Sequence, residues 1–384
     1  MCLSEGVVFE VDASTGRVTA VSEIKQLTPL STSPLSTPPP AQAELLSLAD
    51  EEGREWWDSL SLGYPEQQGS ELLRREIAAD YTSLPPSHLN VLSPAEGIYL
   101  TMRALLSGGD HVVVTSPGYQ SLSEVARAIG CEISPWKPQP REGGKGEVEL
   151  CFEPSDLKQL IRPGRTKMVI ANWPHNPTGC LPSEGEADEV VGLCRANGVF
   201  LFVDEMYRGL EHGPTPRLPA ACDAYERGVS LGGMSKAYGL PGLRIGWLGS
   251  RSQPFMDRIA ELKDYTSICP PAPYACSPPS LNLPVERSAL AGVRCEVLAF
   301  IALRSKEALL ARSRAIAARG LAACRSHVSS HPHALKWREP RGGTFSLVGL
   351  RFSEQSLRAG GSAHAYCEAL RRHAAVRSRA MPRS

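Results

Sequence analysis

A lysine and an arginine flank a short glycine-containing loop, SKAYGLPGLR, in the second half of the chain. Lys236 follows Ser235 directly, and Arg244 ends the run. A lone lysine is most often a solvated surface charge, because lysine is seldom buried. Burial disfavours the ammonium form, however, and a neutral amine can form a Schiff base with an aldehyde. Because Arg244 can clamp a phosphate and the glycines let the backbone approach closely, this loop is a candidate site for such chemistry.

Two other motifs place polar groups after apolar runs. Asp204 and Tyr207 stand in VFLFVDEMY, and Asn176 stands in NWPHNPTG. A carboxylate at the end of a buried strand is costly unless it meets a cation, such as the pyridinium nitrogen of a pyridoxal cofactor. Asp204 could instead cap the next segment, Tyr207 could simply complete the core, and Asn-Pro-Thr-Gly is an ordinary turn. The isomer of the bond before Pro177 does not follow from the sequence.

Taken together, these motifs resemble those of the class I/II aminotransferases, which are fold type I enzymes that use pyridoxal 5'-phosphate. NPTG, VDEMY and SKAYGLPGLRIGW occur in the order and approximate spacing of that family. The resemblance implies that Lys236 carries the cofactor and moves protons, and that Asp204 keeps the pyridine nitrogen protonated. It also implies that Asn176 and Tyr207 bond the ring oxygen. The expected catalytic residues are Lys236, Asp204 and Tyr207.

The resemblance implies further cofactor contacts. Tyr119, in SPGY, matches an aromatic ring that stacks on the cofactor, although it could be an ordinary residue at a helix start. Tyr64, in LGYPEQQG, matches a tyrosine that reaches the cofactor phosphate of a neighbouring subunit, which implies a homodimer. Ser235 and Arg244 match phosphate ligands.

The segment LSPAEGIYL departs from the family pattern. It is expected to place a helix N-terminus at the phosphate. Pro94 stands where the family commonly has glycine, and because proline has no N–H, we expect the donors to be Ala95 and Glu96. Gly233 stands where many members have a phosphate-binding serine, which removes one hydroxyl contact.

The runs between the motifs predict an α/β fold that positions these residues. HVVVTS, KMVIANW and VFLFVDE are typical of buried strands and alternate with helical segments. This alternation predicts a three-layer α/β/α large domain with a mostly parallel sheet, in which ligands bind beyond the carboxyl ends of the strands. The pattern then predicts a long helix from about 296 to 327, followed by two strands and a last helix. These elements predict a smaller α+β domain, to which both ends of the chain contribute. We divide the chain into an N-terminal arm (1–45), a large cofactor-binding domain (46–290) and a small C-terminal domain (291–384).

Two regions break the family pattern. Residues 274–295 mix Pro, Ser and Cys without a clean period, and we interpret them as an inserted loop or a retained intron. Family members continue past the last helix into a strand and a helix that carry the arginine for the substrate α-carboxylate. The small domain is therefore expected to be truncated, and substrate orientation is at risk. We assign the clamp to none of Arg377, Arg379 and Arg383.

Composition excludes several classes of protein. The 384 residues include 41 basic and 41 acidic side chains without a long one-sign block before the arginine-rich end, so charge favours neither nucleic acid nor a membrane. No apolar run approaches the roughly 20 residues of a bilayer span, and the N-terminus resembles no signal or transit peptide. The 11 cysteines form no C-x-x-C pair, which argues against zinc and favours a cytoplasmic protein.

The sequence therefore predicts a transaminase that moves an amino group from an L-amino acid to a 2-oxo acid through a Lys236 Schiff base. A β-lyase, an oxidase or a cyclase stays open, because these enzymes share the lysine, aspartate and asparagine. LSPAEGI and KDYTSIC resemble a branch of the family that includes enzymes acting on arginine-derived amino acids. The alternative from another class is a non-catalytic cofactor-binding paralogue, for which the missing arginine clamp is the evidence.

Overall fold

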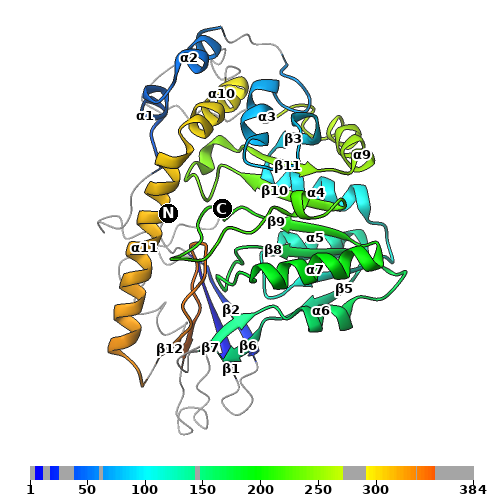
Figure 1. Cartoon of the computed structure of the whole chain (residues 1–384), viewed down its shortest axis with the longest axis vertical. Helices are drawn as coiled ribbons and strands as arrows, with labels where there is room; N and C mark the ends of the chain where they lie inside the picture. The colour runs from blue at the N-terminus through cyan, green and yellow to red at the C-terminus, as the bar shows by residue number, and fades with distance from the viewer. Residues whose placement is uncertain are drawn as a thin grey trace, which may run out of the picture.

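The computed structural model describes most of the chain between Glu5 and Leu350 (Figure 1). A large sheet with helices on both faces forms the main body, and smaller two-stranded sheets lie beside it. The α/β class predicted from the sequence is therefore confirmed. The described residues are 5–11, 18–25, 39–59, 64–142, 148–270, 291–333 and 335–350.

A seven-stranded sheet lies at the centre of the described residues. Its strands are β3 (Leu89–Leu92), β4 (His111–Thr115), β5 (Glu132–Trp136), β8 (Thr166–Asn172), β9 (Phe200–Asp204), β10 (Gly228–Gly233) and β11 (Gly246–Ser250). The strand order is β3-β11-β10-β9-β8-β4-β5. The pairings from β10 to β5 are parallel, whereas β11 runs antiparallel to both β10 and β3. The sheet is thus mixed and mostly parallel, as predicted.

Helices cover both faces of this sheet. One face packs against α4 (Pro94–Leu105), α5 (Ser121–Ile129) and α9 (Gln253–Lys263), and the other against α6 (Pro154–Leu160), α7 (Glu184–Asn197) and α8 (Ala221–Ala224). Successive strand residues point to opposite faces. In β4, accordingly, Val112 and Val114 pack in the core beneath α4, α5 and α9, whereas Val113 packs in the core beneath α6, α7 and α8. The predicted three-layer arrangement is confirmed.

Local sequence explains why these elements form. The runs HVVVT and FLFVD are rich in β-branched and aromatic residues, and nearly every position is buried, as expected of parallel strands covered on both faces. Helix α7 begins with a capping box in which Ser183 and Glu186 exchange side-chain and backbone hydrogen bonds. It ends at Gly198, whose φ of 64° suits a residue without Cβ.

The predicted N-terminal arm contains a hairpin. Strands β1 (Glu5–Val11) and β2 (Val18–Lys25) pair antiparallel. Strand β1 also contacts β13 (Val348–Leu350), which pairs with β12 (Leu335–Trp337). Strands from the two ends of the described chain therefore lie together. The remaining elements are α1 (Gln42–Ser47), α2 (Glu51–Asp58), α3 (Glu71–Ala78), β6 (Gln139–Glu142), β7 (Val148–Cys151) and the 3-10 turns Pro86–His88 and Pro241–Leu243.

The prediction of one long helix from about 296 to 327 is wrong. Two helices, α10 (Ala291–Arg304) and α11 (Lys306–Ser330), meet at Ser305, whose φ of -108° and ψ of 23° depart from helical values. Because α10 begins at Ala291, the last residues of the segment interpreted as an insertion are helical. Residues 271–290 and 351–384, with the predicted last helix and the three C-terminal arginines, lie outside the described residues. None of the described helices combines the length and apolar character that crossing a bilayer requires.

Candidate active site

Three predicted site residues lie at the carboxyl ends of adjacent strands. β8 leads into the loop of Asn176, β9 ends at Asp204, and β10 leads to Lys236. These strands are parallel neighbours, so their carboxyl ends meet at one edge of the sheet. The fold therefore gathers the amide, the carboxylate and the amine that sequence analysis selected.

Asp204 is a buried carboxylate within the electrostatic field of Lys236. Its side chain is only 5% exposed, and the backbone N–H of Met206 donates to its Oδ1 at 3.1 Å. Burial raises the pKa of Asp204 to about 6, against the lowering effects of the Met206 hydrogen bond and the Lys236 charge. Glu205 adds a smaller upward effect on the same pKa. A cation placed against Asp204 would relieve the cost of burying this carboxylate.

The Lys236 loop is closed by its own backbone. The N–H of Leu240 donates to Met234 O at 2.9 Å, and the N–H of Met234 donates to Ile245 O at 3.0 Å. Gly239 has a φ of 71°, a conformation that disfavours residues with a Cβ. Lys236 is half-buried between the buried residues Ser235 and Ala237. The backbone of Lys236 is therefore held in a compact turn that follows β10.

The two predicted phosphate ligands of this loop differ in exposure. The Ser235 hydroxyl is buried and has no hydrogen-bond partner among the described residues. Arg244 is exposed, has a φ of 55°, and donates from Nη1 to Pro241 O at 3.2 Å. A buried hydroxyl without a partner is costly, so a ligand oxygen at Ser235 would be stabilising.

Asn172 is a site residue that sequence analysis missed. It is 1% exposed, ends β8, and is paired in register with Asp204 on β9. Its Nδ2 donates to Asp204 O at 2.8 Å, and its Oδ1 accepts from the N–H of Asn176 at 2.6 Å. One amide thus ties the Asn176 loop to the end of β9. The only sequence signal for Asn172 was a polar residue that closes an apolar strand. In the loop that follows, the bond between Asn176 and Pro177 is cis.

Tyr207 lies against a segment that precedes β13. The Tyr207 side chain is 3% exposed, and its ring meets Phe345 edge-on at 5.7 Å between centroids. The N–H groups of Arg341 and Gly342 donate to Gly179 O at 2.8 and 3.1 Å. These bonds dock residues 341–345 onto the NPTG loop, so a distant part of the chain borders the site. Sequence analysis did not select Phe345.

The other two predicted aromatic residues are exposed. Tyr119 follows β4, at the same sheet edge as Asp204, and is 46% exposed. Tyr64 precedes α3 and is 85% exposed. Tyr119 therefore lies where a ring could cover a ligand bound at the strand ends. Tyr64 is open to contact with another molecule.

Helix α4 starts at the same edge of the sheet. Ser93 caps the helix, and its Oγ accepts from the N–H of Glu96 at 3.4 Å. The Glu96 carboxylate accepts from Thr266 Oγ1 at 2.6 Å. Ala95 is exposed in the first turn. The N–H of Glu96 is one of the two donors expected for the phosphate. It already makes a weak hydrogen bond to Ser93, which a phosphate must displace.

These residues fit a pyridoxal 5'-phosphate group. The unpartnered Ser235 hydroxyl suits a phosphate oxygen, and the buried Asp204 carboxylate suits a protonated ring nitrogen. Lys236 supplies the amine at the same edge. No cluster of three His, Cys, Asp or Glu side chains within the described ranges could hold a metal ion.

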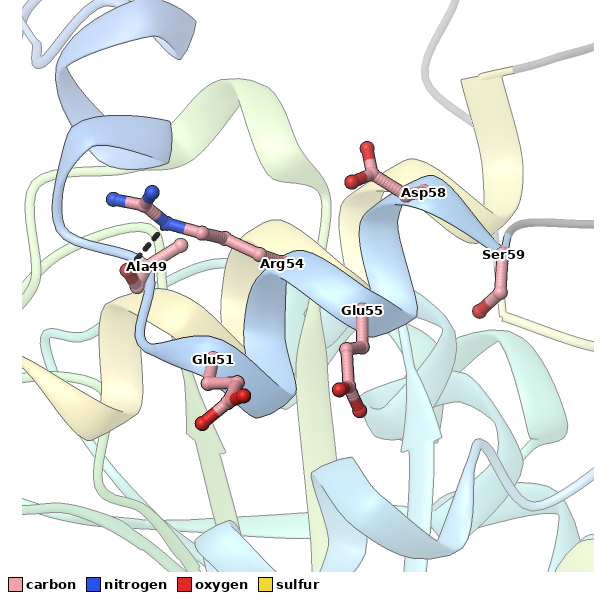
Figure 2. A pocket seen from close by; sticks show the side chains of 6 residues that line it. All are labelled: Ala49, Glu51, Arg54, Glu55, Asp58 and Ser59. Atoms are coloured by element: carbon pink, nitrogen blue, oxygen red, sulfur yellow. Dashed lines mark hydrogen bonds between the residues drawn. The ribbon is translucent and has the colours of Figure 1, made fainter.

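A hollow on the surface of α2 is separate from this site. Figure 2 shows its side chains and the bond from Arg54 Nε to Ala49 O, at 3.1 Å. None of the candidate cofactor residues lines it, so we assign no ligand there. Its lining residues are Ala49, Glu51, Arg54, Glu55, Asp58 and Ser59.

The matches to two curated relatives each cover about half of the chain. Capreomycidine synthase of Streptomyces vinaceus is 33% identical over 203 residues, which are 52% of this chain and 49% of that protein. Valine--pyruvate aminotransferase of Mycobacterium tuberculosis is 32% identical over 199 residues, 50% of this chain and 47% of that protein. The chain thus spans about half the length of these relatives.

Solved structures match more of the chain. A PLP-dependent aminotransferase from Streptococcus suis has a TM-score of 0.70 and 25% identity, covering 88% of this chain and 81% of that one. The PLP-dependent cyclase OrfR also has a TM-score of 0.70, with 28% identity, covering 89% of this chain and 82% of that one. A family model, aminotransferase class I and II, matches residues 58–380 and so extends into the C-terminal segment in which we identified no arginine clamp. The chain therefore belongs to the class I and II aminotransferases, a family that uses pyridoxal 5'-phosphate.

Proposed function

We propose that this protein is a pyridoxal-phosphate-dependent transaminase that moves an amino group from an L-amino acid to a 2-oxo acid. The observation that carries the proposal is the buried Asp204 carboxylate, placed within the field of Lys236 at the carboxyl edge of the sheet. A carboxylate in this position can keep a pyridine nitrogen protonated while a lysine acts as base. Family membership supports the same assignment.

Each residue has a distinct role in this proposal. When bound, the cofactor supplies a protonated ring that accepts electrons from the substrate α-carbon. Lys236 Nζ would hold the cofactor, and as a free amine, after the substrate amino group has taken its place, it would accept the α-carbon proton and deliver it back as an acid. The Asp204 carboxylate holds the proton on the ring nitrogen. Asn176 and Tyr207 donate to the ring oxygen, and Tyr119 covers one ring face and excludes water.

The phosphate and the second subunit complete the proposed site. Ser235, Arg244 and the N–H groups of Ala95 and Glu96 bind the phosphate. Tyr64 reaches the phosphate of a second copy of the chain, which makes the protein a homodimer. Its 85% exposure in a single chain supports this role, because a tyrosine ring so open to water gains stability from a partner surface.

A cyclase is the second candidate. The likeness to capreomycidine synthase and to the PLP-dependent cyclase OrfR favours it. The proposed roles of Lys236 and Asp204 serve proton movement in either reaction. Product analysis separates them, since a transaminase yields a 2-oxo acid and a cyclase yields a ring-closed product.

Titration with pyridoxal 5'-phosphate tests the proposal. Wild-type protein should gain a visible absorbance band, Lys236→Ala should not, and Lys158→Ala, a change of an exposed lysine on α6, should behave as wild type. Adding L-amino acids should then shift the band and release 2-oxo acids. A non-catalytic paralogue would show the band without any amino-acid response. A wild-type protein that never gains the band would refute the cofactor assignment.

A further inference from the structure

A buried lysine outside the proposed catalytic set joins two elements that lead to the phosphate site. Lys263, the last residue of α9, is completely buried. Its Nζ donates to Val91 O at 2.6 Å and to Gln67 O. Lysine is rarely so buried, and an ammonium group out of water is costly without acceptors. The two carbonyls are therefore specific partners of this side chain.

The two carbonyls belong to different parts of the proposed phosphate site. Val91 lies in β3, just before the Ser93 cap of α4. Gln67 lies in the loop that carries Tyr64 and leads into α3, which we call the Tyr64 loop. That loop also bonds to β3 directly, since the N–H of Val91 donates to Gln68 O at 2.8 Å. Lys263 thus connects the start of α4 and the Tyr64 loop to the end of α9.

Buried charges surround this connection. Glu296, on α10, is completely buried, and its Oε1 accepts from the N–H of Ser70 at 3.1 Å, at the end of the Tyr64 loop. Its Oε2 has no hydrogen-bond partner among the described residues. Burial lowers the pKa of Lys263 to about 8 and raises that of Glu296 to about 7. The carboxylates of Glu96 and Glu296 oppose the lowering of the Lys263 pKa.

The side chain of Gln67 reinforces the same link. Gln67 Nε2 donates to Ala260 O, on α9, at 2.8 Å and also to Asp264. The Tyr64 loop is therefore attached to the end of α9 by two contacts: the bond from Lys263 to Gln67 O, and the bonds from the Gln67 side chain to Ala260 O and Asp264. Removing either contact would loosen the loop without altering a proposed cofactor ligand.

We propose that Lys263 is a positioning residue for cofactor binding: by holding the carbonyls of Gln67 and Val91, it sets the places of the Tyr64 loop and of the first turn of α4. This inference rests on the proposed function. Lys263 Nζ donates to two backbone carbonyls and acts through the backbone that presents Tyr64, Ala95 and Glu96. A purely structural role would lower stability without changing cofactor affinity.

The test compares cofactor affinity with stability. Lys263→Met keeps the length of the side chain and removes its donors, and it should raise the Kd for pyridoxal 5'-phosphate by about tenfold, equivalent to about 1.4 kcal/mol. The increase in Tm on adding the cofactor should shrink as well. The matched control is Tyr225→Phe, which removes the buried bond from the Tyr225 hydroxyl to Val199 O (3.0 Å) at the opposite end of β9. It should lower Tm with and without cofactor alike and leave Kd within about twofold.

A second pair of variants covers the case in which Lys263→Met fails to fold. Gln67→Ala removes the side-chain bonds to Ala260 O and Asp264, and it should weaken cofactor binding by a few-fold. Gln253→Ala removes an exposed bond to Asp257 (2.7 Å) at the other end of α9 and should leave binding unchanged. Unchanged affinity in folded Lys263→Met would overturn the inference, and so would unchanged affinity in Gln67→Ala if Lys263→Met does not fold. In both cases the wild-type band would still uphold the proposed function. Loss of the wild-type band would overturn both.

Discussion

Replacing Asp204 by asparagine should stabilise the cofactor-free protein at neutral pH while weakening its proposed cofactor chemistry. Asp204 is 5% exposed, and burial raises its pKa from 3.8 to about 6. At roughly 1.4 kcal/mol per pKa unit, the ionised carboxylate costs the folded protein about 3 kcal/mol above pH 6. Asparagine removes this charge and can still accept the Met206 N–H. The expected gain for Asp204→Asn at pH 7.5 is therefore up to about 3 kcal/mol.

The pH dependence of this gain follows from the sign of the pKa shift. Below pH 3.8 the group is protonated in both the folded and the unfolded chain, so it contributes no difference in stability. Above about 6 it is ionised in both, and the folded state carries the full cost of burial. The advantage of Asp204→Asn should therefore shrink as the pH falls from about 6 to about 4.

Urea unfolding of cofactor-free wild type and Asp204→Asn between pH 4 and 8 measures this difference. Asp188→Asn, a change of an exposed acid on α7, is the control and should track wild type. With pyridoxal 5'-phosphate present, wild type should gain more stability than Asp204→Asn, because only the aspartate pairs with a protonated ring nitrogen. If Asp204→Asn were less stable than wild type at pH 7.5 without cofactor, attraction to Lys236 would outweigh burial and the reasoning would be refuted.

Three further variants test other parts of the site. Ser235→Ala should raise the Kd for the cofactor about tenfold in an absorbance titration and raise the cofactor-free Tm, since it removes a buried hydroxyl that has no described partner; an unchanged Kd would exclude Ser235 from the phosphate site. Asn172→Ala should lower the free energy of unfolding by about 2 to 3 kcal/mol in urea, because two buried bonds are lost; a loss under about 0.5 kcal/mol would contradict this role. Tyr64→Ala should leave the cofactor-free stability of the monomer intact, because the ring is 85% exposed in a single chain, and weaken cofactor binding only in the dimer, as followed by titration with sedimentation. Equal cofactor affinity in Tyr64→Ala and wild-type dimers would argue against a contact across the interface.

Much of the fold follows from local sequence. Runs such as HVVVT and FLFVD form strands because their apolar, β-branched pattern suits burial on both faces. Their alternation with helical segments predicts a mostly parallel sheet, and this prediction is confirmed. The positions of Asp204 and Lys236 after such runs were also readable, because a polar residue at a strand end is a local feature. The division of one predicted helix into two at Ser305 could not be predicted in this way, since the flanking residues continue the helical pattern.

The sequence by itself determined the main strands, the helical segments and the motif residues of this protein, because spacing and residue type act over a few neighbours. Only the tertiary structure decided how the strands were ordered, that β11 runs against its neighbours, and that Asn172 lies opposite Asp204. Only the fold brought Phe345 to Tyr207, and Lys263 to the carbonyls of Gln67 and Val91. These contacts join residues that are far apart in the chain. They are selected by packing and sheet register, which no short stretch of sequence encodes.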